Sequence, residues 1–321
     1  MISVVKAGIG TAAIIYNENC LRHDTGRGHP ESAERLKAVL AALRGSPRAK
    51  DFDWVEATAA PASDVERVHT RSYIRWVEET CLKGGELLDS GDTRVSFESY
   101  DAALCSAGVA VSAVDYVLLG LGKRAFALTR PPGHHARPGE AMGFCIFNNI
   151  AIAAAHAREK YGLERILIID WDVHHGNGTQ EIFYDDPGVL FFSIHQSPFW
   201  PHTGASTETG RGRGEGMTLN VPVPVGADIG TYRKAFIEQL QPAVTAFKPE
   251  LILISAGFDA HKEDPLAAVV LEDEDFDELG QMVVEWADRY TDGQMISFLE
   301  GGYNLRALGR CAERHARLLL V

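Results

Sequence analysis

Short, continuous runs of apolar residues recur along the chain, and amphipathic stretches separate them. The runs are rich in Ile, Val, Leu and Phe, which is typical of strands that are covered on both faces of a sheet. They predict strands over residues 11–16, 124–129, 165–170, 189–195, 217–221, 250–255 and 294–299. Apolar positions at helical spacing predict helices over residues 34–43, 100–119, 149–161, 229–247 and 273–290.

This alternation of strands and helices predicts one three-layer α/β/α domain over residues 1–321, built around a mainly parallel sheet. No linker rich in Pro, Gly or Ser interrupts the pattern, and the chain shows no internal repeat. In such folds ligands bind beyond the carboxyl ends of the strands, so we expect functional residues directly after the apolar runs.

Composition narrows the class of partner. The 321 residues include 31 Lys and Arg against 44 Asp and Glu, which gives a formal net charge of −13. This charge argues against a nucleic-acid backbone or an anionic membrane as the main partner. No stretch approaches the roughly 20 apolar residues that a membrane span needs, so we expect none.

Two further patterns bear on compartment and cofactor. Five cysteines without regular spacing predict reduced thiols and a cytoplasmic protein rather than a disulfide framework. Residues 8–13 (GIGTAA) fit a dinucleotide-binding pattern, but a strand rather than a helix follows them. We therefore expect no dinucleotide cofactor.

Candidate metal ligands follow two of the predicted strands. Asp170, Asp172 and His174 alternate in an extended segment, so their side chains project to the same side. Asp259 follows a second strand and should lie at the same edge of the sheet. Two Asp oxygens and one His nitrogen with an open position are the ligand set of a catalytic zinc. We expect one zinc per chain, with iron(II) as an alternative because oxygen-rich sites select zinc only weakly.

Candidate acid–base residues follow two other strands. Two carboxylate ligands nearly neutralise the charge of the ion, so a nearby imidazole is needed to take the proton of the attacking water. His135 is the predicted base, with Asn177 orienting its ring, whereas His134 should face Asp170 and be held charged. Tyr303 follows two glycines, and its hydroxyl is predicted to stabilise the oxyanion.

Six motifs carry a resemblance to a known family. PPGHH, GFCIFNN, DWDVHHGNGTQ, SIHQ, SAGFD and LEGGYN, in this order and spacing, resemble the zinc-dependent histone deacetylase family. The chain is most similar to the class II branch and its bacterial deacetylase-like amidohydrolases, because Asn177 stands where class I enzymes have Asp. The resemblance implies an arginase-like α/β fold and hydrolysis of N-acetyl-lysine or similar amides.

The resemblance also implies roles for individual residues. It assigns zinc to Asp172, His174 and Asp259, the general base to His135 and transition-state support to Tyr303. It implies one structural potassium ion near Asp170, Asp172, His174, Ser193 and Ile194, and a second near Phe183, Asp186 and Val189. Gly143, Phe144, Trp200 and Leu266 would line the substrate tunnel, and Arg35 would lie deep behind the site. Ala33 departs from the family, which usually has proline there.

Four functions stay open, and the oligomeric state is not predicted. The first is removal of acyl groups from lysine in proteins or peptides, and the second is deacetylation of small acetylated amines such as polyamines. Leu266 favours lysine, because polyamine-selective relatives carry a glutamate at the matching position. The third is a binuclear manganese ureohydrolase, which would need more bridging carboxylates. The fourth is a catalytically dead acyl-lysine binder, which would lack a base, a ligand or the tyrosine.

Overall fold

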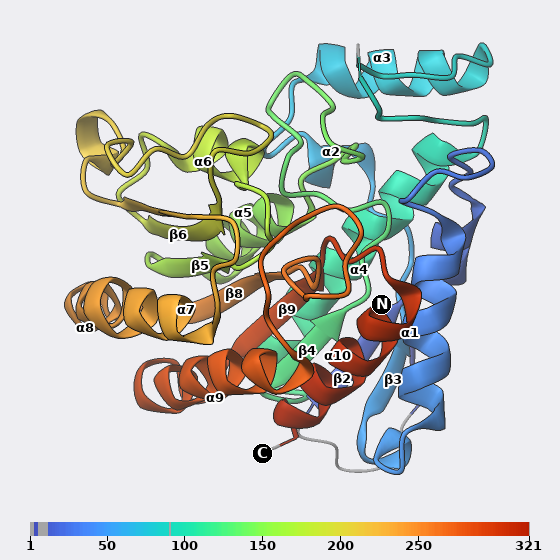
Figure 1. Ribbon diagram of the computed structural model, residues 1–321. Coiled ribbons are helices and arrows are strands. Elements are labelled where there is room, and N and C mark those ends of the chain that lie inside the picture. The colour runs from blue at the N-terminus through green and yellow to red at the C-terminus, as the bar shows by residue number, and fades with distance from the viewer. Residues whose placement is uncertain (1–2, 6–11, 90, 321) are drawn as a thin grey trace.

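A computed structural model describes residues 3–5, 12–89 and 91–320 of the chain (Figure 1). Most of the GIGTAA stretch therefore lies outside the described residues. The described strands form one nine-stranded sheet in the order β1-β3-β2-β4-β9-β8-β5-β6-β7. The strands are β1 (Ser3–Val5), β2 (Ala12–Tyr16), β3 (Asp53–Glu56), β4 (Arg124–Ala127), β5 (Ile166–Asp170), β6 (Val189–Gln196), β7 (Thr218–Val223), β8 (Leu251–Ala256) and β9 (Met295–Leu299).

Helices cover both faces of this sheet, which confirms the predicted three-layer fold. One apolar core joins the sheet to helices including α1, α9 and α10, and a second joins it to α4 and α5 (Figure 1). The described helices are α1 (Ala33–Gly45), α2 (Ala62–Val65), α3 (Arg71–Leu82), α4 (Ser99–Leu118), α5 (Asn149–Tyr161), α6 (Asn177–Phe183), α7 (Ile229–Ala235), α8 (Gln241–Phe247), α9 (Asp273–Tyr290) and α10 (Leu305–Leu318). That all of residues 1–321 form a single catalytic domain stays a prediction.

Strand β5 shows why the central strands are continuous apolar runs. Leu167 and Ile169 belong to the core shared with α1, α9 and α10, whereas Ile166 and Ile168 belong to the core shared with α4 and α5. Successive side chains of a strand point to opposite faces, so a strand covered on both faces needs apolar residues at every position.

The structure adds elements that the apolar pattern did not predict. β1 and β3 lie at one end of the sheet, and β1 pairs antiparallel with β3, while the other described strand pairs are parallel. β3 (DWVE) has only two apolar positions, and the charged sequence of α10 hides its amphipathic pattern. The predicted helix over 229–247 consists of α7 and α8 joined by a π-helical segment.

Helix α4 corrects one expectation about membranes. By length and composition alone it is long and apolar enough to cross a membrane, although no such stretch was expected from the sequence. However, 72% of its most apolar window is buried inside the protein. The core helix of a soluble protein meets the same criterion, so α4 is weak evidence for a membrane span.

Candidate active site

The predicted functional residues come together where four neighbouring strands end. β4, β9, β8 and β5 are adjacent and parallel, so their carboxyl ends lie along one edge of the sheet. The loops that follow them carry the histidine pair, the tyrosine, Asp259 and the Asp-x-His segment respectively. This placement agrees with the general position of ligand sites in parallel α/β folds.

Asp172, His174 and Asp259 form a compact group of potential metal ligands. Nδ1 of His174 lies 3.1 Å from Oδ1 of Asp172 and 3.1 Å from Oδ2 of Asp259. The other oxygen of each carboxylate is held by the backbone, since Gly301 N–H donates to Asp172 Oδ2 at 2.8 Å and Val173 N–H donates to Asp259 Oδ1 at 2.9 Å. Each carboxylate therefore keeps one oxygen directed toward His174.

The chemistry of this group fits a divalent cation. Both carboxylates are fully buried, and two buried negative charges need a compensating positive charge. Burial disfavours a charged imidazole, yet hydrogen bonds to Asp172 and Asp259 raise the pKa of His174 to about 10. A Cβ at Gly301 would come within 2.1 Å of Asp259 Oδ2 and 2.5 Å of Asp172 Oδ2, so glycine is required beside the two carboxylates. Two carboxylates and one imidazole match a three-ligand zinc site.

The histidine pair after β4 has the partners that the sequence predicted. Nδ1 of His134 lies 2.9 Å from Oδ2 of Asp170, and Nδ1 of His135 lies 2.7 Å from Oδ1 of Asn177. Burial opposes charge on His134, but Asp170 raises its pKa well above the usual range. Burial and the charges of His134 and His174 all lower the pKa of His135. Because an amide oxygen only accepts, His135 donates from Nδ1 and is neutral with Nε2 free to accept a proton.

Buried charged groups fix the loop that carries Tyr303, and the sequence analysis named only one of them. Arg35 donates from Nε to the carbonyl of Gly302 at 2.7 Å and from Nη2 to the carbonyl of Glu300, and its guanidinium lies 4.9 Å from the ring centroid of Tyr303. On the other side, Asp264 accepts from Tyr303 N–H at 2.7 Å. The position of Tyr303 thus depends on two oppositely charged side chains.

A cavity of about 240 Å³ leads to this group of residues. The four predicted substrate residues line it, together with His135, His174 and Tyr303, and with Pro30 and Asp92, which the sequence analysis did not single out; the predicted four are Gly143, Phe144, Trp200 and Leu266. The rings of Trp200 and His135 lie 4.7 Å apart and those of Phe144 and Tyr303 lie 5.8 Å apart, both edge to face. We call this cavity the tunnel.

Residues of the two expected potassium sites fall in different regions. In the first set, Asp170 ends β5 and is in register with Ser193 on β6, so these residues lie next to the metal group. In the second set, Phe183 ends α6 and Val189 begins β6, which places it away from the tunnel. There Asp186 forms an ion pair with Arg158. Both potassium sites stay predictions.

Fold and site together define a class, a hydrolase of the mainly parallel α/β type with a three-ligand metal group and a histidine pair. The histone deacetylase domain family matches residues 29–319. A probable deacetylase of Archaeoglobus fulgidus is 42% identical over 294 residues, covering 91% of this chain and 81% of that protein. A histone deacetylase-like amidohydrolase of Pseudomonas aeruginosa is 37% identical over 91% of this chain and 81% of its own length.

Two further relatives extend the comparison. The polyamine deacetylase HDAC10 of Homo sapiens is 40% identical over 97% of this chain, which spans 48% of that protein. The crystal structure of the HDA15 HD domain superposes with a TM-score of 0.90 at 36% identity, covering 98% of this chain and 89% of that one. The chain therefore belongs to the histone deacetylase family, a zinc-dependent family of hydrolases, and it is a deacetylase.

Proposed function

We propose that this protein removes acetyl or other acyl groups from lysine side chains, with one zinc ion held by Asp172, His174 and Asp259. The observation that supports the proposal most strongly is the convergence of this buried ligand group, a neutral histidine and a tyrosine hydroxyl on one narrow tunnel. The chemistry that zinc supplies when bound is polarisation of the amide carbonyl and acidification of water.

The side chains around the tunnel would divide the proton transfers. His135 would accept the proton of the attacking water at Nε2, because Nδ1 is engaged with Asn177 and the low pKa keeps the ring neutral. His134, charged beside Asp170, would hold positive charge next to the reacting groups. Burial raises the pKa of Tyr303 well above its usual range, so its hydroxyl stays protonated and can donate to the developing oxyanion.

The tunnel also supports a preference for acyl-lysine. Leu266 contributes an apolar side chain to its lining, as do Phe144 and Trp200. Such walls suit the methylene stem of lysine, whereas the extra ammonium groups of a polyamine gain from a carboxylate. Leucine at this position provides no charge.

A specific observation favours the second candidate, an acetylpolyamine deacetylase. Asp92 lines the same tunnel and offers a carboxylate to a cationic substrate. Burial and the neighbouring Asp89 raise the pKa of Asp92, which weakens this attraction without removing it. The HDAC10 relatives, which are named as polyamine deacetylases, point in the same direction.

One set of assays separates the two candidates. Purified protein is tested on acetyl-lysine peptides, longer acyl-lysines and acetylspermidine, and Leu266→Glu is compared with the uncharged Leu266→Gln of the same shape. Leu266→Glu should raise the ratio of acetylspermidine to acetyl-lysine turnover by about fivefold, which corresponds to ~1 kcal/mol in a hydrated mouth, while Leu266→Gln should not. Wild-type protein that favours acetylspermidine by about tenfold would refute the lysine preference.

Metal analysis tests the ligand assignment separately. Asp259→Ala should lose both turnover and bound metal, and the wild type should hold one divalent ion per chain. Two transition metals per chain would instead support the ureohydrolase alternative. The potassium sites and a cytoplasmic location are proposals of the same kind, based on the family resemblance and on cysteine usage respectively.

A further inference from the structure

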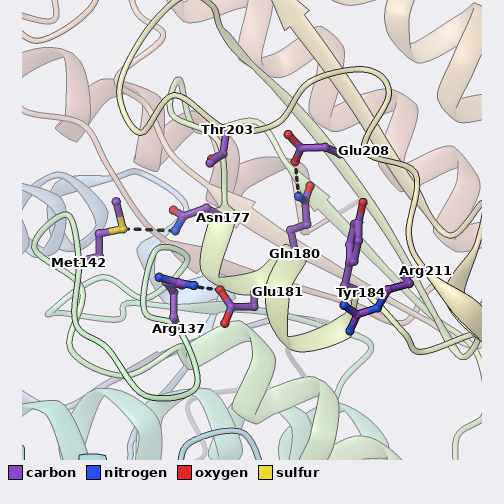
Figure 2. Close-up of a pocket in the computed structure, with 9 residues that line it drawn as sticks. All are labelled: Arg137, Met142, Asn177, Gln180, Glu181, Tyr184, Thr203, Glu208 and Arg211. Atoms are coloured by element: carbon purple, nitrogen blue, oxygen red, sulfur yellow. Dashed lines mark hydrogen bonds and ion pairs between the residues drawn. The ribbon is translucent and has the colours of Figure 1, made fainter.

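A second cavity, of about 570 Å³, adjoins the tunnel and has no part in the mechanism above. It lies between α6 and the loops at 137–142 and 203–211 (Figure 2). We call it the side pocket and define it by Arg137, Asn177, Gln180, Tyr184, Glu208 and Arg211. Figure 2 shows Arg137 and Arg211 on opposite sides of the view, with the Asn177 and Gln180 amides between them.

The side pocket and the tunnel share a wall. Asn177 lines the side pocket, His135 lines the tunnel, and the 2.7 Å hydrogen bond between them spans the wall. Met142 lines the side pocket, while the next residue, Gly143, lines the tunnel. On the pocket side, Nδ2 of Asn177 has one weak contact, with Met142 Sδ at 3.4 Å. A ligand in the side pocket could therefore hydrogen-bond to the residue that orients His135.

The carboxylates around the side pocket already have partners. Glu208 accepts from Gln180 at 2.6 Å and from the backbone N–H groups of Gly204 and Ala205 at 3.2 and 3.1 Å. Glu181 pairs with Arg137, which also binds Glu140, and Asp185 pairs with Arg211 at 2.9 Å; among the described residues these are the acidic groups paired with the two arginines. These acidic groups are therefore largely neutralised.

Hydrogen-bond donors, by contrast, remain free. Arg211 binds Asp185 through Nε and Nη2, which leaves Nη1 without an acceptor among the described residues. Arg137 likewise keeps Nη2 uncommitted, and no described residue hydrogen-bonds to the Tyr184 hydroxyl. With the spare proton on Asn177 Nδ2, the lining offers donors from both sides of the cavity. Such a lining suits a ligand that carries acceptors at both ends.

We propose that the side pocket binds a small dicarboxylate, and that the bound ligand increases turnover by holding the Asn177 amide with Oδ1 toward His135. Planar guanidinium groups favour carboxylates as ligands. The net charge of −13 opposes an anion, but charges beyond ~8–10 Å are screened at physiological salt, so the local donors decide. The effect on turnover rests on the proposed deacylase function, whereas the binding does not.

Binding is measured by calorimetry on the metal-loaded protein, with succinate as the probe and succinamide as an uncharged control of similar size. Succinate should bind saturably and succinamide should not. Arg211→Gln should weaken succinate binding by about tenfold, because it removes a charged donor. Arg213→Gln is the matched control, since Arg213 is equally exposed on the same loop but does not line the side pocket. It should leave binding unchanged.

Turnover of an acetyl-lysine peptide then tests the coupling. Succinate should raise kcat with little change in KM, and this effect should be weakened in parallel with binding in Arg211→Gln. Absence of saturable binding, or binding that is equal in Arg211→Gln and wild type, would refute the site. Inhibition that is competitive with the peptide would place succinate in the tunnel instead, and binding without any change in kcat would refute the coupling. Inactive wild-type protein that still binds succinate would refute the proposed function but not the site.

Discussion

Replacing Glu31 with glutamine should destabilise the protein far more than the loss of an ordinary surface charge. Glu31 is fully buried between two fully buried arginines. Its Oε1 accepts from Arg130 Nε at 2.8 Å and from Arg35 Nη1 at 3.3 Å, and its Oε2 accepts from Arg130 Nη2 at 3.0 Å. The variant would leave two buried guanidinium groups without their shared carboxylate.

The size of this effect follows from the pKa of Glu31. Burial alone would raise that pKa, but the charges of Arg130, His23 and Arg35 lower it from 4.5 to about 2. This difference between the folded protein and the ordinary value corresponds to roughly 3 kcal/mol of folding free energy at neutral pH. Removing one partner of a buried ion pair typically destabilises a protein by ~3–5 kcal/mol, which agrees.

The pH dependence has a defined sign. Since the folded protein lowers the pKa of Glu31, the stabilisation is complete above about pH 4.5 and is lost as the pH falls toward 2. Glutamine has no such dependence. The stability difference between wild type and Glu31→Gln should therefore shrink by about 1 kcal/mol between about pH 5 and pH 3.5.

Urea unfolding followed by circular dichroism and tryptophan fluorescence measures this difference. Glu34→Gln is the control, because Glu34 is 60% exposed and pairs with Lys37 on the surface of α1. It should change the free energy of unfolding by less than about 0.5 kcal/mol. A Glu31→Gln protein within about 1 kcal/mol of wild type at neutral pH would refute the reasoning, because the arginines would then not depend on this carboxylate.

Three further predictions concern turnover. Tyr303→Phe should lower kcat by roughly 100–1000-fold with metal content unchanged, since it removes one oxyanion donor, and a variant that keeps half its activity would exclude this role. His135→Ala should lower kcat more than His134→Ala, because only His135 is proposed to accept the proton; equal losses would contradict that division. Asp264→Asn should lower kcat while metal analysis stays normal, because an amide cannot accept from the backbone with both of its polar atoms.

The metal group was predictable because it depends on local geometry. Asp172 and His174 follow a strand directly, and their alternation in an extended segment dictates that they share a side. Asp259 follows a neighbouring strand, and parallel strands end at one edge of the sheet. The pairing of His135 with Asn177 came from the same strand-end reasoning, and the 2.7 Å contact agrees with it.

Residues placed by loop packing were not predictable in this way. Asp92 lies in the loop between α3 and α4, which has no apolar period to show where it runs. Its entry into the tunnel accompanies a contact made by the next residue, because Thr93 Oγ1 accepts from the backbone N–H of Phe144 at 3.2 Å. No spacing in the sequence links these two positions.

Asp264 marks the boundary between what local sequence can and cannot show. Its Oδ1 accepts from the N–H of Leu266, two residues on, at 3.0 Å. That turn is typical of Asp followed by Pro, so the sequence could have indicated it. Its Oδ2 accepts from the N–H of Tyr303, 39 positions away. This second contact exists only because β8 and β9 are neighbours in the sheet. One carboxylate thus positions both a proposed specificity residue and the proposed oxyanion donor, and only half of that role is local.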